Sequence, residues 1–193
     1  MRYSAEQKLE ARARIVEASG RAFRRHGYGG IGVDGLAKEA GVTSGAFYGH
    51  FKSKDEAFRG IAVGGLKDLA TAIEALQAEH GAAWIDPFID FYLGERRTCD
   101  LGQSCALQSL TPDVMRADET VRAEYEAAFL AVVQAVAQGL TGLERGTTHD
   151  RALALLALLS GGVTLARSMA SPRMSDDIAE ALRAGAMALL HQS

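Results

Sequence analysis

The chain has 193 residues, of which 48% are hydrophobic, and its 21 Lys and Arg against 24 Asp and Glu give a formal net charge of −3. This apolar fraction excludes an intrinsically disordered protein, and the length is sufficient for one large domain or two small ones with a buried core. The cysteines, Cys99 and Cys105, are too few for a disulfide scaffold and indicate a reducing compartment.

The N-terminal segment is charged and lacks the apolar stretch of a signal peptide. The longest weakly polar run, residues 152–166, is shorter than the roughly 20 apolar residues that span a bilayer. We therefore expect a soluble, cytoplasmic protein that does not interact with membranes.

Charge is distributed unevenly along the chain. Residues 1–59 contain 11 basic and 7 acidic side chains, a balance of +4, whereas residues 60–193 contain 10 and 17, a balance of −7. A small basic N-terminal module on an acidic body suggests that the N-terminus contacts a polyanion, although an imbalance of this size is also common in solvated surfaces.

Helix-forming residues dominate the sequence, and alternating β-branched runs are almost absent, so we predict an all-α fold. In the N-terminal part, a helix capped by Ser4 is expected to end at Gly27, and a long helix capped by Ser53 is expected to end at Gly81. Short helices are predicted between them at about 33–40 and 43–50, and further helices near 83–97, 104–110, 119–140, 148–170 and 175–191, with linkers at 98–102, 111–118, 141–147 and 171–174.

Residues 33–51 predict two short helices joined by a tight turn. Gly41 supplies the positive φ that such a turn requires, and Ala37 is small where the helices cross. A shared core is expected from Val33, Leu36, Val42 and Phe47. The second helix would then expose small and polar residues, which permit a helix to approach the base edges of a DNA major groove.

Three segments resemble the TetR family of transcriptional regulators: Phe23-Arg-Arg-His-Gly-Tyr28, Leu36-Ala37, and the run from Gly41 to Phe58. The rest of the chain is similar to that family only in its length and helical layout. The resemblance implies an N-terminal three-helix, helix-turn-helix DNA-binding domain at residues 1–55. It also implies a C-terminal helical bundle at residues 56–193 that binds an effector and forms a homodimer.

The resemblance further implies that Val42 to His50 contains the recognition helix. Tyr48 and Lys54 would bind phosphates, and Thr43 and Ser44 would contact bases or phosphate. The full set of expected DNA contacts is Thr43, Ser44, Gly45, Tyr48, His50, Lys52 and Lys54. One position departs from the family, which often has Ser or Thr where this chain has Gly32, so a phosphate-binding hydroxyl is missing there.

Aromatic residues recur on one face of the helix predicted near 83–97, and Tyr125 pairs with Phe129 on another helix. Such stripes are usually core, but the resemblance places an effector cavity in this part of the bundle. If they line that cavity, the site consists of Trp84, Phe88, Phe91, Tyr92, Cys105, Leu107, Gln108, Tyr125 and Phe129. It would suit a small apolar or aromatic effector, with Gln108 as its polar group.

The last two predicted helices are apolar over much of their circumference and need cover. A two-fold, four-helix interface with a second copy would supply it, and this arrangement matches the dimer implied by the resemblance. We expect this interface to contain Leu155, Leu159, Gly162, Val163, Ile178 and Leu182. Burial of both helices within a monomer is the alternative.

Other patterns suggest different chemistry. Cys99 and Cys105 are interpreted as a surface thiol and a packed residue, or alternatively as a sensor of oxidants or electrophiles, as used by some members of the TetR family. Residues Gly30–Gly35 match the GxGxxG motif, but no predicted strand precedes them, as a dinucleotide-binding site requires. Ser104 with His149 leaves a hydrolase as a remote alternative, although the sequence lacks the second glycine of a nucleophile elbow. The histidines have no metal-ligand spacing.

The sequence therefore predicts a homodimeric transcriptional regulator without enzymatic activity, metal or cofactor. We expect a repressor that binds a palindromic duplex operator and is released when a small effector binds the C-terminal bundle. A thiol-based regulator on the same scaffold is the alternative.

Overall fold

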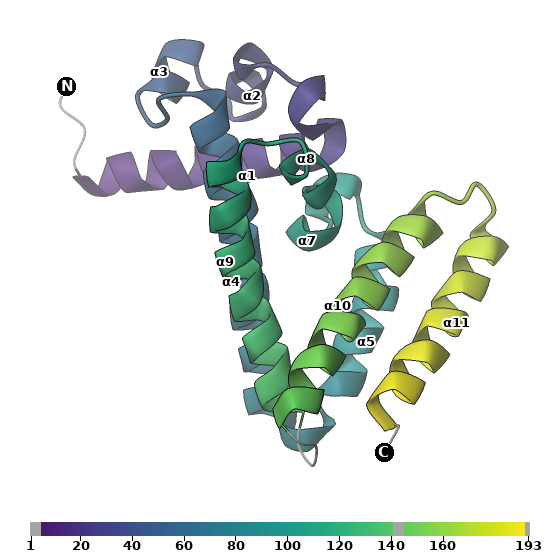
Figure 1. The fold of residues 1–193 in the computed structure, drawn as a ribbon. Helices are drawn as coiled ribbons and strands as arrows, with labels where there is room; N and C mark the ends of the chain where they lie inside the picture. Colours follow the sequence, from purple (N-terminus) through teal and green to yellow (C-terminus); the bar gives the residue numbers. More distant parts are fainter. Residues whose placement is uncertain (1–4, 141–144, 192–193) are drawn as a thin grey trace. The chain divides into compact units, whose positions relative to one another are not determined.

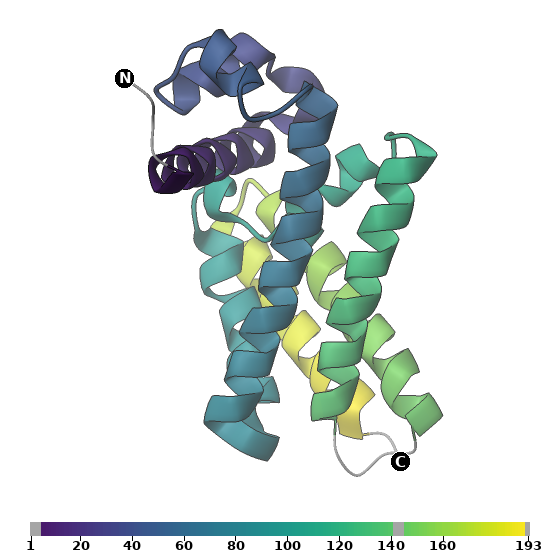
Figure 2. The same cartoon turned by 90° about the vertical axis from the view of Figure 1, so that its left-hand side faces the viewer.

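The computed structural model describes residues 5–140 and 145–191, and every regular element in these ranges is a helix (Figures 1 and 2). This confirms the all-α prediction. The predicted cap Ser4 and most of the predicted linker at 141–147 lie outside the described residues. None of the described helices is long and apolar enough to cross a membrane. The elements are α1 (Ala5–Gly30), α2 (Val33–Glu39), α3 (Ser44–Tyr48), α4 (Lys54–His80), η1 (Gly81–Ala83), α5 (Ile85–Leu93), α6 (Glu95–Thr98), η2 (Leu101–Gln103), α7 (Ala106–Ser109), α8 (Thr111–Val114), α9 (Glu119–Gly139), α10 (Arg145–Arg167) and α11 (Pro172–His191).

Two predicted segments differ from the structure. The helix expected near 83–97 follows the short helix η1 and is divided into α5 and α6, because the backbone of Gly94 leaves the helical region with φ −92° and ψ −90°. The linker expected at 111–118 contains α8, where Pro112 occupies the first turn, a position that suits proline.

The chain forms two compact units, and of the three boundaries between them one falls within α4, one within α9 and one between α6 and η2. The first contains the described residues of 1–64 together with 101–125, and the second contains 65–100 together with the described residues of 126–193. This grouping reflects packing, and the functional division expected between residues 55 and 56 stays a prediction.

The core of the first unit is aromatic. Phe23 of α1 packs edge to face against Phe58 of α4, with ring centroids 5.4 Å apart, and both are buried. Leu36 and Phe47 are also fully buried, which fixes α2 and α3 on this core. The regular part of α1 ends at Gly27, where φ is 70°, as predicted, and one further helical turn follows.

The second unit is built around α5 and α10, and α11 runs alongside α10 (Figures 1 and 2). Trp84, at the start of α5, is 1% exposed, and its indole Nε1 donates to the carbonyl of Gly139 at 2.9 Å. Gln77 Nε2 donates to the carbonyl of Ala135 at 2.7 Å. The indole satisfies the carbonyl of Gly139 at the end of α9, where the last carbonyls have no partner within the helix.

Candidate nucleic-acid interface

The α2–α3 hairpin has the local geometry that the sequence predicted. Gly41 adopts φ 66°, and the turn is closed by a 2.9 Å hydrogen bond from Val42 N to Ala37 O. Ala37 is 2% exposed, so its small side chain lies where the helices pack. Of the residues expected in the shared core, Leu36 and Phe47 are fully buried, and Val33 and Val42 are half-buried.

Helix α3 exposes almost all of its side chains. Phe47 is its one buried residue, whereas Gly45, Ala46 and Tyr48 are exposed, Tyr48 to 54%. The Tyr48 ring packs edge to face on Phe47, with centroids 5.9 Å apart, and this contact supports an otherwise solvated aromatic ring. The result is a protruding surface of small residues beside one phenol hydroxyl.

Hydroxyl groups at the start of α3 already have partners within the hairpin. Thr43 Oγ1 accepts a 3.1 Å hydrogen bond from Ala46 N and caps the helix, which leaves the hydroxyl proton available to a phosphate. Ser44 Oγ donates to Asp34 Oδ1 and so links α3 to α2. Gly32 caps α2 through its backbone only, as the missing hydroxyl implied.

Basic residues follow α3 at the start of α4. Lys52 is exposed, and its backbone N–H donates to Glu56 Oε2 at 2.7 Å, while Glu56 N donates to Ser53 Oγ at 3.1 Å. The predicted cap at Ser53 is thus confirmed. Lys54 Nζ lies 4.0 Å above the ring of Tyr28, and His50 is half-buried. Sequence reasoning missed the support that Tyr28 gives to Lys54.

Tyr28 is held from two sides. Its hydroxyl donates to Asp55, and its backbone N–H donates to Asp113 Oδ2 at 2.9 Å. The hydrogen bond to Asp55, with partial burial and the carboxylate charge, raises the pKa of Tyr28 to about 12. The sequence placed Asp113 in a linker, and no local pattern connects it with a residue 85 positions earlier.

The expected effector residues lie mainly in the core. Trp84, Phe88 and Tyr92 are each 1% exposed and pack in series, with centroid distances of 5.5 and 5.3 Å. Phe91 and Phe129 are half-buried, and the Phe91 ring carries the guanidinium of Arg96 at 4.5 Å. The aromatic stripe on α5 is therefore largely core.

A second group of expected effector residues lies in the first unit, where Cys105, Leu107, Gln108 and Tyr125 are buried. The hydroxyls of Tyr125 and Thr111 are 2.7 Å apart, and burial raises the pKa of Tyr125 to about 12. Gln108 Oε1 has no hydrogen-bond partner among the described residues.

The expected dimer residues turn inward. Leu155, Leu159 and Val163 are 0% exposed and Leu182 is 9% exposed within a single chain, so these side chains are unavailable to a second copy in this conformation. Gly162 faces Leu182, and Ile178 is half-buried. The apolar character of α10 was recognised correctly, but its inward side was assigned to the interface. Packing of α10 against α5 and α11 accounts for that side.

The alternative sites also have defined surroundings. Ser104 is 3% exposed and donates its hydroxyl proton to Leu101 O, so it is not presented as a nucleophile. The segment before Gly30 is helix α1 rather than the strand of a dinucleotide site. Cys99 and Cys105 are not joined in a disulfide, and they are half-buried and buried respectively. No group of three potential metal ligands occurs in the described part of the chain.

Comparison with known proteins agrees with this geometry. Residues 15–61 match the sequence model described as "Bacterial regulatory proteins, tetR family". HTH-type transcriptional regulator TtgR of Pseudomonas putida is 43% identical over 56 residues, which cover 29% of this chain and 27% of TtgR. HTH-type transcriptional repressor DhaR of a Mycobacterium species is 28% identical over 118 residues, which cover 61% of this chain and 59% of DhaR. The chain thus matches less than two thirds of the length of either relative.

The likeness to solved structures extends along nearly the whole chain. SCO4454, a TetR-family transcriptional regulator from Streptomyces coelicolor, superposes with a TM-score of 0.76 at 19% identity, covering 94% of this chain and 95% of that one. At this identity the superposition shows a common fold. The family match over residues 15–61, which contain α2 and α3, places this part of the chain in the TetR family of bacterial regulatory proteins, and the superposition shows that the chain as a whole has the fold of a TetR-family regulator.

Proposed function

We propose that the protein is a cytoplasmic repressor that binds a palindromic duplex operator as a homodimer and is released by a small effector. The observation that carries this proposal is the exposed surface of α3, where Gly45, Ala46 and Tyr48 protrude while Phe47 alone anchors the helix. Small residues on a protruding helix permit close approach to the floor of a major groove, which is wide enough to admit a helix.

Phosphate contacts are proposed around this surface. Tyr48 and Thr43 present hydroxyls, and Lys52 and Lys54 present ammonium groups; Ser44, Gly45 and His50 complete the proposed contact set. Hydrogen bonds to a charged partner contribute about 1.5–3 kcal/mol each, whereas bases are discriminated mainly by groove-edge contacts. Because the small residues of α3 offer few bidentate contacts, we expect shape and phosphate positions to contribute much of the specificity.

The dimer is proposed to use the outward side of α10 and α11. This exposed α10–α11 face consists of Ala154, Ala157, Gly161, Leu165, Met174, Ala181, Ala184 and Ala188, all exposed in the single chain. Small side chains would let the helices of two copies pack closely, and a two-fold axis would present two α3 helices to a palindromic site. We expect Ala157→Arg, with its unpaired charge, to give monomers in analytical ultracentrifugation, while the matched Lys67→Arg remains dimeric.

The effector is proposed to be small and apolar or aromatic. Within the predicted effector set, Gln108 Oε1 is a buried acceptor without a partner among the described residues, which typically costs about 1–3 kcal/mol. An effector that donates a hydrogen bond to this oxygen would recover that free energy. A coupling of about 1–3 kcal/mol between effector and DNA would give a useful switch.

The test is a titration of the purified chain with the duplex DNA that flanks its own gene, at several salt concentrations. We expect tight binding with a steep salt dependence, weakened by Tyr48→Ala. Lys52→Ala should reduce the salt slope by about one, whereas Lys67→Ala, which removes an exposed charge from the middle of α4, should leave the slope unchanged. Failure to bind any duplex would contradict the proposal.

A thiol switch is a second candidate function because of one contact. Arg167 Nη1 lies 3.8 Å from Cys99 Sγ, and Cys99 lines an open cavity with Arg97 and Arg167. Hydrogen peroxide would oxidise the thiol to a sulfenic acid, with water as the reduced product. We expect mild peroxide to abolish DNA binding in the wild type and in Cys105→Ser but not in Cys99→Ser. Unchanged binding in the wild type would exclude this switch.

A further inference from the structure

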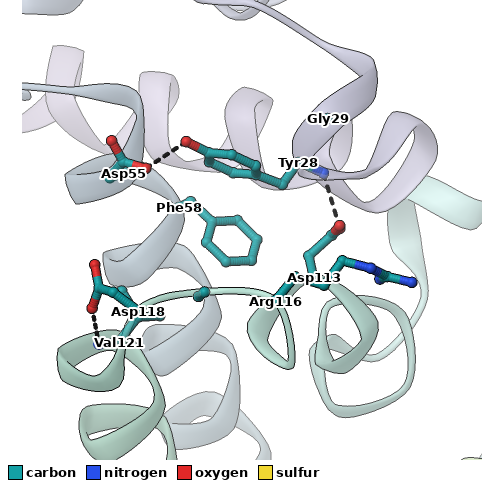
Figure 3. Close-up of a pocket in the computed structure, with 9 residues that line it drawn as sticks. Tyr28, Gly29, Asp55, Phe58, Asp113, Arg116, Asp118 and Val121 are labelled. Carbon is teal, nitrogen blue, oxygen red and sulfur yellow. Dashed lines mark hydrogen bonds between the residues drawn. The ribbon is translucent and has the colours of Figure 1, made fainter.

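A cavity of about 390 Å³ lies within the first unit, and most of the residues around it have no part in the DNA, effector or dimer contacts assigned above (Figure 3). It is formed by the end of α1, the start of α4, and the segment that runs from α8 into α9. The residues that line it are Tyr28, Gly29, Asp55, Phe58, Asp113, Arg116, Ala117, Asp118 and Val121.

Two aromatic rings form part of the cavity wall. Tyr28 and Phe58 are arranged edge to face, with centroids 5.1 Å apart, and Phe58 and Val121 are buried at 2% and 5% exposure. The face of an aromatic ring attracts cations. The Tyr28 ring already contacts a cation, because Lys54 Nζ lies 4.0 Å from the ring centroid. Lys54 is not among the residues that line the cavity.

Three carboxylates also line the cavity, against one guanidinium. Each is oriented by a hydrogen bond to one of its oxygens: Asp55 Oδ1 accepts from the Tyr28 hydroxyl, Asp113 Oδ2 from Tyr28 N, and Asp118 Oδ1 from Val121 N. Arg116 donates to the carbonyl of Pro112, and Figure 3 shows its side chain directed away from the two rings.

The spacing of the carboxylates favours an organic ligand over a metal ion. No three potential metal ligands among the described residues lie close enough to share one ion. An alkylammonium group is larger than a metal ion, is attracted by carboxylates that lie farther apart, and carries an apolar body that suits Phe58 and Val121. We propose that this cavity binds a small organic cation, with its ammonium group among the three carboxylates and its apolar body against Phe58 and Val121.

The test measures binding by the full chain in the absence of DNA, using isothermal titration calorimetry. The probes are benzyltrimethylammonium, neutral benzyl alcohol and anionic phenylmethanesulfonate, which share a benzyl group and differ in charge. We expect saturable binding of the cation alone. Because no DNA is present, the result does not depend on the function proposed above.

Variants locate the site without removing its hydrogen bonds. Asp113→Asn and Asp118→Asn retain an oxygen that can accept from Tyr28 N and Val121 N, so each should fold and weaken cation binding about five-fold. Asp68→Asn, on the exposed surface of α4 outside the cavity, should bind like the wild type.

Three results would each overturn the proposal. They are equal binding of all three probes, no cation binding at millimolar concentration, and unchanged affinity in both cavity variants. If a variant unfolds, the shift in wild-type melting temperature caused by each probe provides the same discrimination by charge.

Discussion

Helices α3 and α5 are both short and both contain aromatic residues, but they use them in opposite ways. In α3 one residue, Phe47, is buried and the others are at least partly exposed, whereas α5 buries Phe88, Ile89, Tyr92 and Leu93. A helix with one anchor can change its exposed side chains at little cost to folding. Substitutions on α3 should therefore report on a binding partner, and substitutions on α5 should report on stability.

The largest effect is expected at the start of α5. Trp84→Ala removes a buried indole and leaves the Gly139 carbonyl without its donor, so the free energy of unfolding should fall by about 3–5 kcal/mol. Circular dichroism in urea measures this without relying on fluorescence, since Trp84 is the single tryptophan. Phe91→Ala, on the half-buried side of α5, is the control and should cost much less; equal losses would show that α5 lacks a distinct buried side.

Adjacent glycines of α10 sharpen the contrast between inward and outward surfaces. A Cβ at Gly162 would lie 2.3–2.8 Å from three Leu182 side-chain atoms, whereas one at Gly161 would meet nothing within 4 Å. Gly162→Ala should therefore destabilise the protein by about 1–3 kcal/mol through overpacking. Gly161→Ala should be the less damaging of the two, because its Cβ meets no atom of the same chain within 4 Å and alanine is the better helix former.

Urea unfolding of both alanine variants at one protein concentration compares them directly, because the proposed dimerisation would make apparent stability depend on concentration. If Gly161→Ala is the more damaging substitution, then the outward surface of α10 is packed in solution more tightly than the inward one.

Much of the helix-turn-helix could be predicted because its signals are local. Gly41 sets the turn through its own φ, and Thr43 and Ser53 cap helices through hydrogen bonds to backbone groups three residues away. Such features depend on neighbouring atoms alone, and the sequence displays all of them.

Contacts between residues distant in sequence were less predictable. The apolar circumference of α10 indicates burial, but it does not distinguish the side that faces the chain's own core from the side that faces outward. Leu155 lies on the side that is buried within the single chain. The contact between Tyr28 and Asp113 joins residues 85 positions apart, and the cavity beside it follows from that contact. Aromatic residues that recur on one side of a helix are ambiguous in the same way, because the same residue types form a buried core and the wall of a ligand cavity.

On α3, Gly45→Ala should separate binding from folding. A Cβ there would meet only Thr43 Oγ1, at 3.9 Å, and alanine should raise the free energy of unfolding by about 0.5–1 kcal/mol. If the backbone of α3 approaches the groove closely, the added methyl group should weaken DNA binding about ten-fold, about 1.4 kcal/mol. The DNA titration described above measures this effect.

Gly60→Ala makes the same chemical change on an open surface of α4 and should leave DNA affinity unaltered. DNA affinity that is equal in Gly45→Ala and wild type would mean that α3 does not approach the groove through Gly45.

The smallest effect is expected from the hydroxyl of Tyr28, and it should depend on pH. Its hydrogen bond to Asp55 raises the pKa of Tyr28 from 10.0 to about 12, so the folded state holds this proton more tightly than the unfolded state. The stabilisation is therefore complete below pH 10 and is lost as the pH rises towards 12. Tyr28→Phe should cost at most about 1 kcal/mol at pH 8, because the pair is partly exposed, and the difference from wild type should shrink at about pH 10–11.

Urea unfolding across this pH range provides the measurement, and in an Asp55→Asn background the change with pH should be reduced. A difference that stays constant from about pH 8 to 11 would show that the hydroxyl does not bind Asp55 in solution, and would remove one of the two contacts that position the ring beneath Lys54.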